Sequence, residues 1–233
     1  MAVADDLAAA YAAAFDCDPR SAFGGIVACN RPVDLETVAA MEAAAQADMI
    51  LAPGYDDGVI ERLVAKRKNT RILTVPRPEP TPPVVLRPLA DGFLVQEAHR
   101  FDTDPARWTV VSARQPSDPE LTDAAFAWRV CGHVNSNAIV LAKDGVAWGI
   151  GAGQQNRVES AQIAAAKAAG RATGGACASD AFYPFPDGVH AAADAGAAIV
   201  VQPGGSVGDD AVIAAADERG VAMVFTGERQ FLH

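Results

Sequence analysis

The chain has 233 residues, of which 50% are hydrophobic and 6% aromatic, and its 19 basic and 29 acidic side chains leave a formal net charge of −10. This length suffices for one large domain or two small ones with a substantial core. The acidic balance argues against nucleic acid as the main partner, because nucleic-acid-binding domains usually present a basic face. It leaves room for a small anionic ligand, since a local site can be positive inside an acidic protein.

The cysteines and the N-terminal residues predict a cytoplasmic protein. The four cysteines form no CxxC pair and have no histidine at metal-ligand spacing, so we expect reduced, mostly buried thiols and no structural zinc. The first residues, Met-Ala-Val-Ala-Asp-Asp, are acidic where a secretory signal is basic. No apolar run is long enough to span a membrane.

The first part of the chain alternates helices and strands. Asp5 or Asp6 caps a helix that runs to about Phe15. The pattern then predicts strands over 26–29, 48–52 and 71–75, and helices over 35–46 and 57–67. This β-α-β-α-β order implies a sheet covered by helices.

A proline-rich stretch divides the chain, because residues 76–88 contain six prolines. We therefore expect residues 1–76 to be one subdomain, 77–92 a stiff connector and 93–233 a second subdomain. Beyond the connector, strands are predicted over 93–98, 108–112, 138–141, 146–150, 197–202 and 221–225, and helices over 119–134, 157–169 and 210–219. The chain is thus expected to form two similar α/β halves.

The stretch 136–160 has the strongest functional pattern. Gly149, Gly151 and Gly153 open the backbone between a predicted strand and a helix that begins at Arg157. Bare amides, a helix start and an arginine together are typical of an anion site. Alternatively, these glycines only permit close packing of the strand against the helix. Neither the dinucleotide-binding GxGxxG fingerprint nor the P-loop sequence fits this stretch.

Residues 179–187, Ser-Asp-Ala-Phe-Tyr-Pro-Phe-Pro-Asp, gather three aromatic residues between two acids. They predict either a core plug with helix caps or a platform for a flat ring whose donor-rich edge an acid binds. The glycine turn 203–206 is likewise either a tight turn or a second backbone cradle. His133 is the histidine whose position suggests a function, although the helix end that it follows also stabilises an imidazolium passively.

Several strings of the chain occur in the order that is found in one family. They are residues 18–25 (DPRSAFGG), 136–140 (SNAIV), 149–157 (GIGAGQQNR), 179–187 (SDAFYPFPD) and 227–233 (GERQFLH). In these strings, and over nearly its whole length, the chain resembles the C-terminal transformylase domain of the bifunctional purine biosynthesis enzyme AICAR transformylase/IMP cyclohydrolase.

The resemblance implies an α/β fold of duplicated cytidine-deaminase-like three-layer α/β/α subdomains, without the deaminase zinc. It implies an intertwined homodimer with shared active sites and no nucleic-acid or membrane partner. The reaction of the family is formyl transfer from 10-formyltetrahydrofolate to the 5-amino group of AICAR, the penultimate step to IMP. The folate is a co-substrate, no transition metal is implied, and a structural monovalent cation near Ser136 stays open.

The resemblance also implies roles for individual residues. Phe182 would stack on the imidazole ring, Asn137 would bind the carboxamide region, and Arg157 would lie on the phosphate side. The implied AICAR residues are Phe23, Gly24, Asp48, Asn137, Arg157, Phe182 and Arg229. The implied folate residues are Val158, Asp187, Ser206 and Val207. Asn137 and the terminal His233 are implied in the catalytic centre.

The chain departs from the family pattern in ways that bear on activity. The family's catalytic Lys-His pair belongs to a Lys-His-x-Asn-Pro-Cys-Gly string just before the helix that here starts near Asp5, and the chain begins at Met1 after that point. An upstream Arg-Tyr string and the cyclohydrolase domain are also missing. Gly208 stands where bacterial relatives usually carry Arg, and Asn135 where they often carry Lys. We therefore expect the chain alone to be nearly inactive while it keeps part of the binding surface.

Two other interpretations stay open. The chain is either a non-catalytic nucleotide- or folate-binding fragment that acts only with a fuller subunit, or an unrelated nucleotide-dependent enzyme that uses residues 149–153. AICAR and folate should bind to the transformylase and to the binding fragment, but not to an unrelated enzyme.

Overall fold

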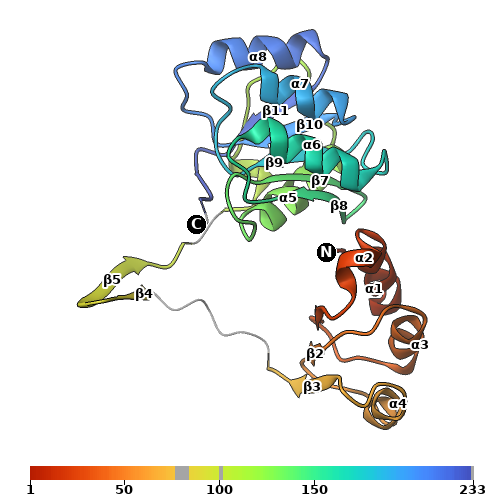
Figure 1. Cartoon of the computed structure of the whole chain (residues 1–233). Helices are drawn as coiled ribbons and strands as arrows, with labels where there is room; N and C mark the ends of the chain where they lie inside the picture. The colour runs from red at the N-terminus through yellow and green to blue at the C-terminus, as the bar shows by residue number, and fades with distance from the viewer. Residues whose placement is uncertain (77–83, 100–101, 232–233) are drawn as a thin grey trace. The chain divides into compact units, whose positions relative to one another are not determined.

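The computed structural model describes residues 1–76, 84–99 and 102–231 (Figure 1). The chain forms two compact units: the larger comprises residues 1–5, 13–18 and 101–233, and the smaller comprises residues 6–12 and 19–100. The domain boundaries expected from the sequence, with a connector over 77–92, stay a prediction.

A six-stranded sheet forms the centre of the larger unit, in the order β6-β11-β10-β9-β7-β8. Its middle strands β9, β10 and β11 are parallel, whereas β6 pairs antiparallel with β11, β7 with β9, and β8 with β7. The strands are β6 (Thr109–Val110), β7 (Ile139–Lys143), β8 (Val146–Gly151), β9 (Ala176–Ser179), β10 (Ile199–Gln202) and β11 (Ala222–Phe225).

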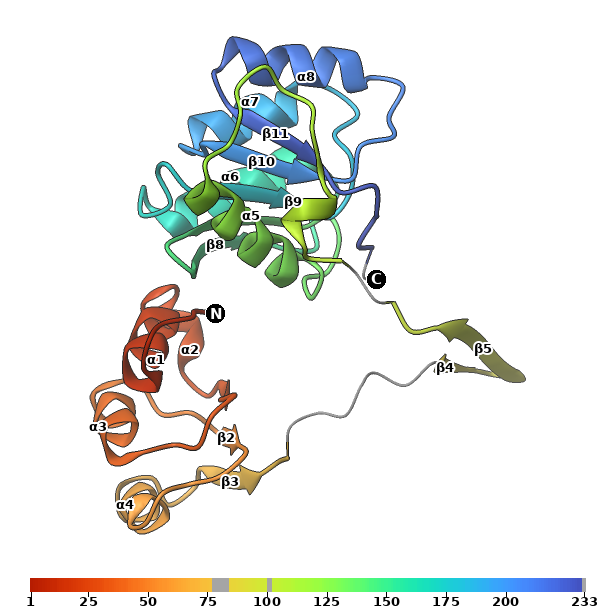
Figure 2. The same ribbon diagram turned by 180° about the vertical axis from the view of Figure 1, so that it is seen from behind.

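Helices cover both faces of this sheet, so the larger unit has three layers. Helices α6, α7 and α8 lie on the face seen in Figure 1, and α5 lies on the face seen from behind in Figure 2. Along β7, Ile139 and Leu141 pack towards α6–α8, whereas Val140 packs towards α5. Because both faces are buried, these strands are apolar throughout rather than alternating. The helices are η1 (Pro105–Arg107), α5 (Asp118–Cys131), α6 (Arg157–Ala168), α7 (Asp187–Asp194) and α8 (Asp209–Glu218).

The smaller unit has a three-stranded parallel sheet in the order β1-β2-β3. Its core contains Met41 of α3, Ile50 of β2 and Leu63 of α4. Asp34 caps α3, since its side chain accepts a hydrogen bond from the Thr37 amide at 2.7 Å. The elements are α1 (Leu7–Asp16, whose last turn belongs to the larger unit), α2 (Pro19–Ala22), β1 (Ile26–Ala28), α3 (Leu35–Ala43), β2 (Met49–Ala52), α4 (Val59–Lys66) and β3 (Arg71–Thr74).

Strands β4 (Val84–Leu89) and β5 (Gly92–Glu97) pair with each other in an antiparallel hairpin. This hairpin overlaps the connector expected over residues 77–92, whose bounds stay a prediction. An apolar Val-Val-Leu run pairs there with the end of β5, and Pro88 is accommodated because the sheet has only two strands. Residues 77–83, the most proline-rich part of the expected connector, lie outside the described residues.

The predicted α/β class is confirmed, because helices flank the sheets in both units. Each unit also contains a β-α-β-α-β run whose three parallel strands lie side by side in chain order: β1-β2-β3 in one and β9-β10-β11 in the other. An internal duplication would leave this arrangement, but the cytidine-deaminase-like origin stays a prediction. In the described part of the chain, no helix is both long and apolar enough to cross a bilayer.

Candidate functional site

A buried ion pair joins the start of α6 to the loop that follows β9. Arg157 donates from Nη2 to Asp180 Oδ1 at 3.0 Å and from Nε to Ser179 Oγ at 3.2 Å. The Asp180 side chain is 0% exposed and that of Arg157 is 14% exposed. The Ser136 hydroxyl donates to the other carboxylate oxygen of Asp180. The buried charge of Asp180 is therefore both paired and hydrogen-bonded, as a buried carboxylate must be.

An N-cap hydrogen bond fixes the start of α6, so that Arg157 is its first residue. The Asn156 side chain accepts a hydrogen bond from the Glu159 amide at 2.9 Å and so ends the loop. In the same first turn, the Ser160 hydroxyl donates to the Asn137 carbonyl oxygen at 2.8 Å. The Asn137 side chain in turn donates from Nδ2 to the Gln154 carbonyl oxygen at 2.9 Å. The loop before β7, the loop after β8 and the start of α6 are thereby tied together.

Two of the glycines in this stretch serve packing. A Cβ on Gly149 would lie 2.0 Å from the Ala164 carbonyl oxygen, and one on Gly151 would lie 1.9 Å from the Ser160 carbonyl oxygen. Helix α6 can lie this close to β8 only where β8 has no side chain. Gly153 is different, because its φ of +67° is a left-handed conformation in open space. For Gly149 and Gly151, the packing interpretation is therefore the correct one.

The aromatic cluster is partly a core element, as one of the two sequence interpretations predicted; the ring-binding platform stays a prediction. Tyr183 is fully buried in the core, and burial raises the pKa of its hydroxyl well above the usual value. Phe182 is only partly buried, and the Arg229 guanidinium carbon lies 4.7 Å from its ring centroid. Phe185 is 66% exposed. Tyr183 therefore packs in the core, whereas its neighbour Phe182 has an arginine guanidinium over its ring.

The glycine turn 203–206 lies against the aromatic loop. A Cβ on Gly208 would lie 2.7 Å from the Pro184 carbonyl oxygen, so the absence of a side chain at Gly208 lets the two loops approach. The Asp209 carboxylate accepts hydrogen bonds from the amides of Gly205 (2.8 Å) and Ser206 (3.2 Å). These amides already have an anionic partner within the chain. The Asp209 carboxylate, at the first residue of α8, therefore holds the turn in a tight conformation, and its interpretation as a second backbone cradle stays a prediction.

The residues predicted for folate binding lie around this pair of loops and at the start of α6. Ser206 is partly buried and Val207 is fully exposed. Asp187 is the first residue of α7, and its carboxylate accepts a hydrogen bond from the Gly188 amide at 2.8 Å. Val158, also partly buried, follows Arg157 in α6. Their role in folate binding stays a prediction.

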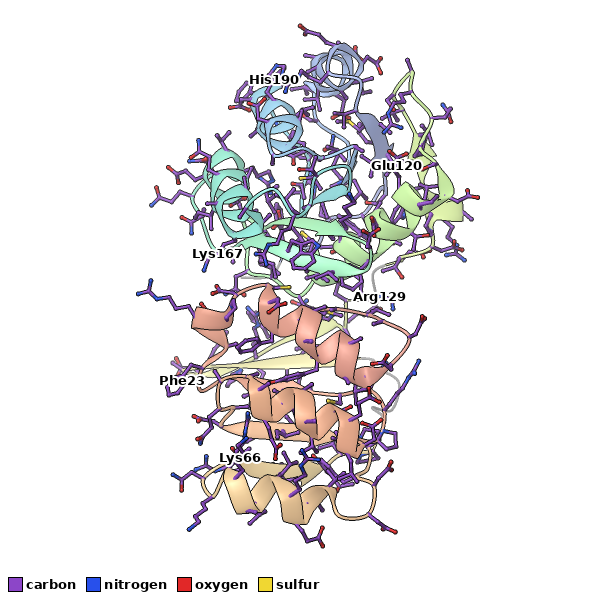
Figure 3. All side chains as sticks on the ribbon, turned by 90° about the vertical axis from the view of Figure 1, so that its right-hand side faces the viewer. Phe23, Lys66, Glu120, Arg129, Lys167 and His190 are labelled. Carbon is purple, nitrogen blue, oxygen red and sulfur yellow. The ribbon has the colours of Figure 1, made fainter. Side chains whose placement is uncertain are left out.

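Three predicted AICAR residues lie in the smaller unit. Phe23 follows α2 and is 73% exposed, as its labelled side chain shows in Figure 3. Gly24 has a φ of +70°, and a Cβ there would lie 3.8 Å from the Asp48 carboxylate. The structure thus brings Gly24 and Asp48 together within this unit. His233, predicted at the catalytic centre, lies outside the described residues.

The remaining ionisable candidates offer no metal centre. Within the described residues, no three His, Cys, Asp or Glu side chains gather as they would around a metal ion. All four cysteines are free thiols; Cys131 and Cys177 are buried, and the other two are half-buried. Desolvation raises the pKa of Cys177 to about 12, so it is protonated at neutral pH. His133 is exposed beyond the end of α5, and His190 lies on α7 (Figure 3).

Sequence reasoning did not predict that Asp180 contacts Arg157 and Ser136. Asp180 was noted only as the acid at one end of the aromatic cluster, although the structure makes it the centre of the polar contacts. A signal was present: a Ser-Asp pair directly after an alanine-rich buried segment, where an acid is rarely left uncompensated. The partner of that acid could not be read from the sequence, because Arg157 lies 23 residues away.

The geometry defines an α/β protein with a buried Arg–Asp pair beside a cation-flanked aromatic face. The family model described as AICARFT/IMPCHase bienzyme matches residues 1–167. The bifunctional purine biosynthesis protein PurH of Synechocystis sp. is 48% identical over 233 residues, which is 100% of this chain and 45% of that protein. PurH of Chlorobium phaeobacteroides is 49% identical over 236 residues (100% and 45%), and PurH of Cereibacter sphaeroides strain ATCC 17029 is 49% identical over 239 residues (97% and 45%).

The chain belongs to the AICARFT/IMPCHase bienzyme family. The resemblance stated from the sequence motifs is thereby confirmed. The chain spans about 45% of the length of the curated relatives that it matches.

Proposed function

We propose that this chain is the transformylase part of a purine biosynthesis enzyme, which transfers the formyl group of 10-formyltetrahydrofolate to the 5-amino group of AICAR. The observation that supports this most is the Phe182 ring with the Arg229 guanidinium beside it, next to the Arg157–Asp180 pair. AICAR combines a flat imidazole carboxamide with a phosphate. An aromatic face and nearby guanidinium groups are the chemistry that such a ligand requires.

In this proposal the AICAR residues of the larger unit have distinct roles. Phe182 stacks on the imidazole ring, and Arg229 and Arg157 attract the anionic nucleotide. Asn137 lies at the carboxamide and the reacting amine, in a loop held by its hydrogen bond to Gln154. Phe23, Gly24 and Asp48 are AICAR residues in this proposal as well. Val158, Asp187, Ser206 and Val207 bind the folate, and His233 completes the centre.

The chemistry requires a base that these 233 residues do not obviously supply. The AICAR amine is a weak nucleophile, because its lone pair is delocalised into the ring and the carboxamide. Its attack needs a group that takes its proton and charge stabilisation of the tetrahedral oxyanion. No Lys-His pair occurs in the sequence. Loss of a general base costs about 10²- to 10⁴-fold in rate, so we expect binding with weak turnover.

The proposal includes a cytoplasmic homodimer with shared active sites. The β4–β5 hairpin supports a second copy, because its register places the side chains of Val84, Leu86, Phe93 and Val95 on one face. All four are exposed, and exposed apolar patches of this kind mark association surfaces. A structural monovalent cation near Ser136 also stays a proposal.

The test is formyl transfer from 10-formyltetrahydrofolate to AICAR, measured on this chain and on one extended upstream through a Lys-His string. Isothermal titration of AICAR accompanies both assays. We expect both chains to bind AICAR and only the extended one to turn over rapidly. If neither chain binds AICAR, the proposal is wrong.

The absent Lys-His pair also favours a second candidate, a non-catalytic binding fragment that acts with a fuller subunit. In that case both chains bind AICAR, and neither turns over until a complete subunit is added. Equal turnover in both chains would instead mean that a residue within these 233 supplies the base, with His133 and His233 tested first.

A further inference from the structure

We propose that Asp180 is a positioning residue of the AICAR site, which holds the Arg157 guanidinium in place and joins the segments that carry Asn137 and Arg229. This inference rests on the proposed function, in which Arg157 and Arg229 are AICAR ligands. Asp180 itself touches no ligand, because its side chain is 0% exposed. It can act only through the groups that it holds.

Both oxygens of the Asp180 carboxylate are occupied by groups of the site. Oδ1 accepts from Arg157 Nη2 at 3.0 Å, and Oδ2 accepts from the Ser136 hydroxyl. Ser136 directly precedes Asn137, so this contact anchors the residue proposed at the reacting amine. One carboxylate thus connects the start of α6 with the loop before β7.

The backbone of Asp180 connects two further segments. Its carbonyl oxygen accepts a hydrogen bond from the Gln230 amide at 2.8 Å, next to Arg229, and its amide donates to the Ala138 carbonyl oxygen at 3.3 Å. Phe182 follows two residues later and faces Arg229. The segments that supply the stacking ring and both guanidinium groups therefore meet at Asp180.

The physical benefit is preorganisation of a long side chain. An unrestrained arginine loses rotamer entropy when it is immobilised, and a ligand must offset that loss on binding. In this protein Arg157 is held at two points, by the Asp180 carboxylate and the Ser179 hydroxyl, before any ligand arrives. Its side chain still keeps 14% of its surface accessible, which is where an anionic ligand can reach it.

The test is a double-mutant cycle on the full chain, with AICAR as the titrated ligand. The variants are Asp180→Asn, Arg157→Gln and the double substitution, and thermal unfolding is recorded for each. We expect Asp180→Asn to weaken AICAR binding about tenfold or more, and the double variant to lose less affinity than the two single losses combined, because part of the Asp180 effect acts through Arg157. Additive effects, or unchanged affinity in Asp180→Asn, would overturn the inference.

Asp123→Asn is the matched control for removal of a buried acid. Asp123 is 8% exposed on α5 and accepts from the Gly145 amide at 3.1 Å, away from the residues of the site. We expect Asp123→Asn to lower the melting temperature without changing AICAR affinity. Equal loss of affinity in this control would show that loss of a buried acid, and not positioning, causes the effect of Asp180→Asn.

Ser179→Ala decides the question if Asp180→Asn does not fold. It removes the acceptor of Arg157 Nε and also the hydrogen bond from the Ser179 hydroxyl to the Ala181 carbonyl oxygen. We expect a loss of about two- to fivefold in affinity, and the part due to Arg157 disappears in the Arg157→Gln background. In addition, the Arg157 Nε–H resonance, assigned by its absence in Arg157→Gln, should exchange slowly with water and faster in Ser179→Ala. If the Arg157 Nε–H exchanges with water at the same rate in Ser179→Ala and in the parent chain, the positioning of Arg157 is contradicted, whether or not AICAR binds. If the Nε–H exchanges slowly in the parent chain but AICAR does not bind, only the proposed function is contradicted.

Discussion

Glu120, in the first turn of α5, is the residue whose charge state links pH to stability most directly. The hydrogen bond from the Arg114 guanidinium, opposed by desolvation and aided by the Ser117 amide, lowers the pKa of Glu120 from 4.5 to about 2. Because the folded pKa is the lower one, the ionised carboxylate stabilises the native state. That contribution is complete above pH 4.5 and is lost as the pH falls towards 2.

We therefore expect Glu120→Gln to be less stable than the parent chain at pH 6, with a difference that shrinks as the pH falls from 4.5 towards 2. Urea unfolding at several pH values measures this difference. A difference that is the same at pH 6 and pH 2.5 would show that the capping geometry, and not the charge, is responsible.

The partly buried ring of Phe182 is where a single side chain should matter most for ligand affinity. Phe182→Ala removes the aromatic face, and we expect AICAR binding to weaken about tenfold, since stacking on one ring contributes about 1–3 kcal/mol per base. Calorimetric titration measures the loss. Phe185→Ala, an exposed aromatic in the same loop, is the control, and an equal loss there would contradict a specific role for Phe182.

Among the packed elements, α6 and β8 approach closely because β8 has glycines at positions 149 and 151. Gly151→Ala would place a methyl carbon 1.9 Å from the Ser160 carbonyl oxygen, so helix and strand must separate. We expect a loss of about 1–3 kcal/mol in the free energy of unfolding, measured in urea. Gly92→Ala, at the start of β5, has no atom within 4 Å of the added carbon and should cost far less. Equal stability of the two variants would contradict this account of the packing.

The helices and strands that could be predicted are those whose starts or turns have a recognisable local sequence. Helix α1 was predicted from an aspartate cap, and Asp6 accepts a hydrogen bond from the Ala9 amide as such a cap does. Helix α6 was predicted to begin at Arg157, after the glycines of the preceding stretch, and it does. Strand β9 was missed. Its sequence, Ala-Cys-Ala-Ser, has no β-branched residue, and it becomes a strand because β7 and β10 pair with it on either side.

For the whole molecule, we expect a dimer at micromolar concentration in sedimentation velocity. The basis is the homodimer of the proposed function, together with the exposed apolar face of the β4–β5 hairpin. A hairpin of two strands is only marginally stable in water without a covering surface. A monomer at this concentration would contradict the homodimer in the proposed function.

The family, the α/β class and most helix and strand positions could be read from the sequence, because caps, turns and apolar runs are local features. The order of strands in the sheet could not, and the centre of the candidate site depends on it. Strand order brings Ser136, Arg157 and Asp180 within hydrogen-bonding distance, and it makes Gly149 and Gly151 packing residues rather than an anion cradle. Contacts between residues this far apart in the chain are set by how the layers pack, and no local pattern encodes them.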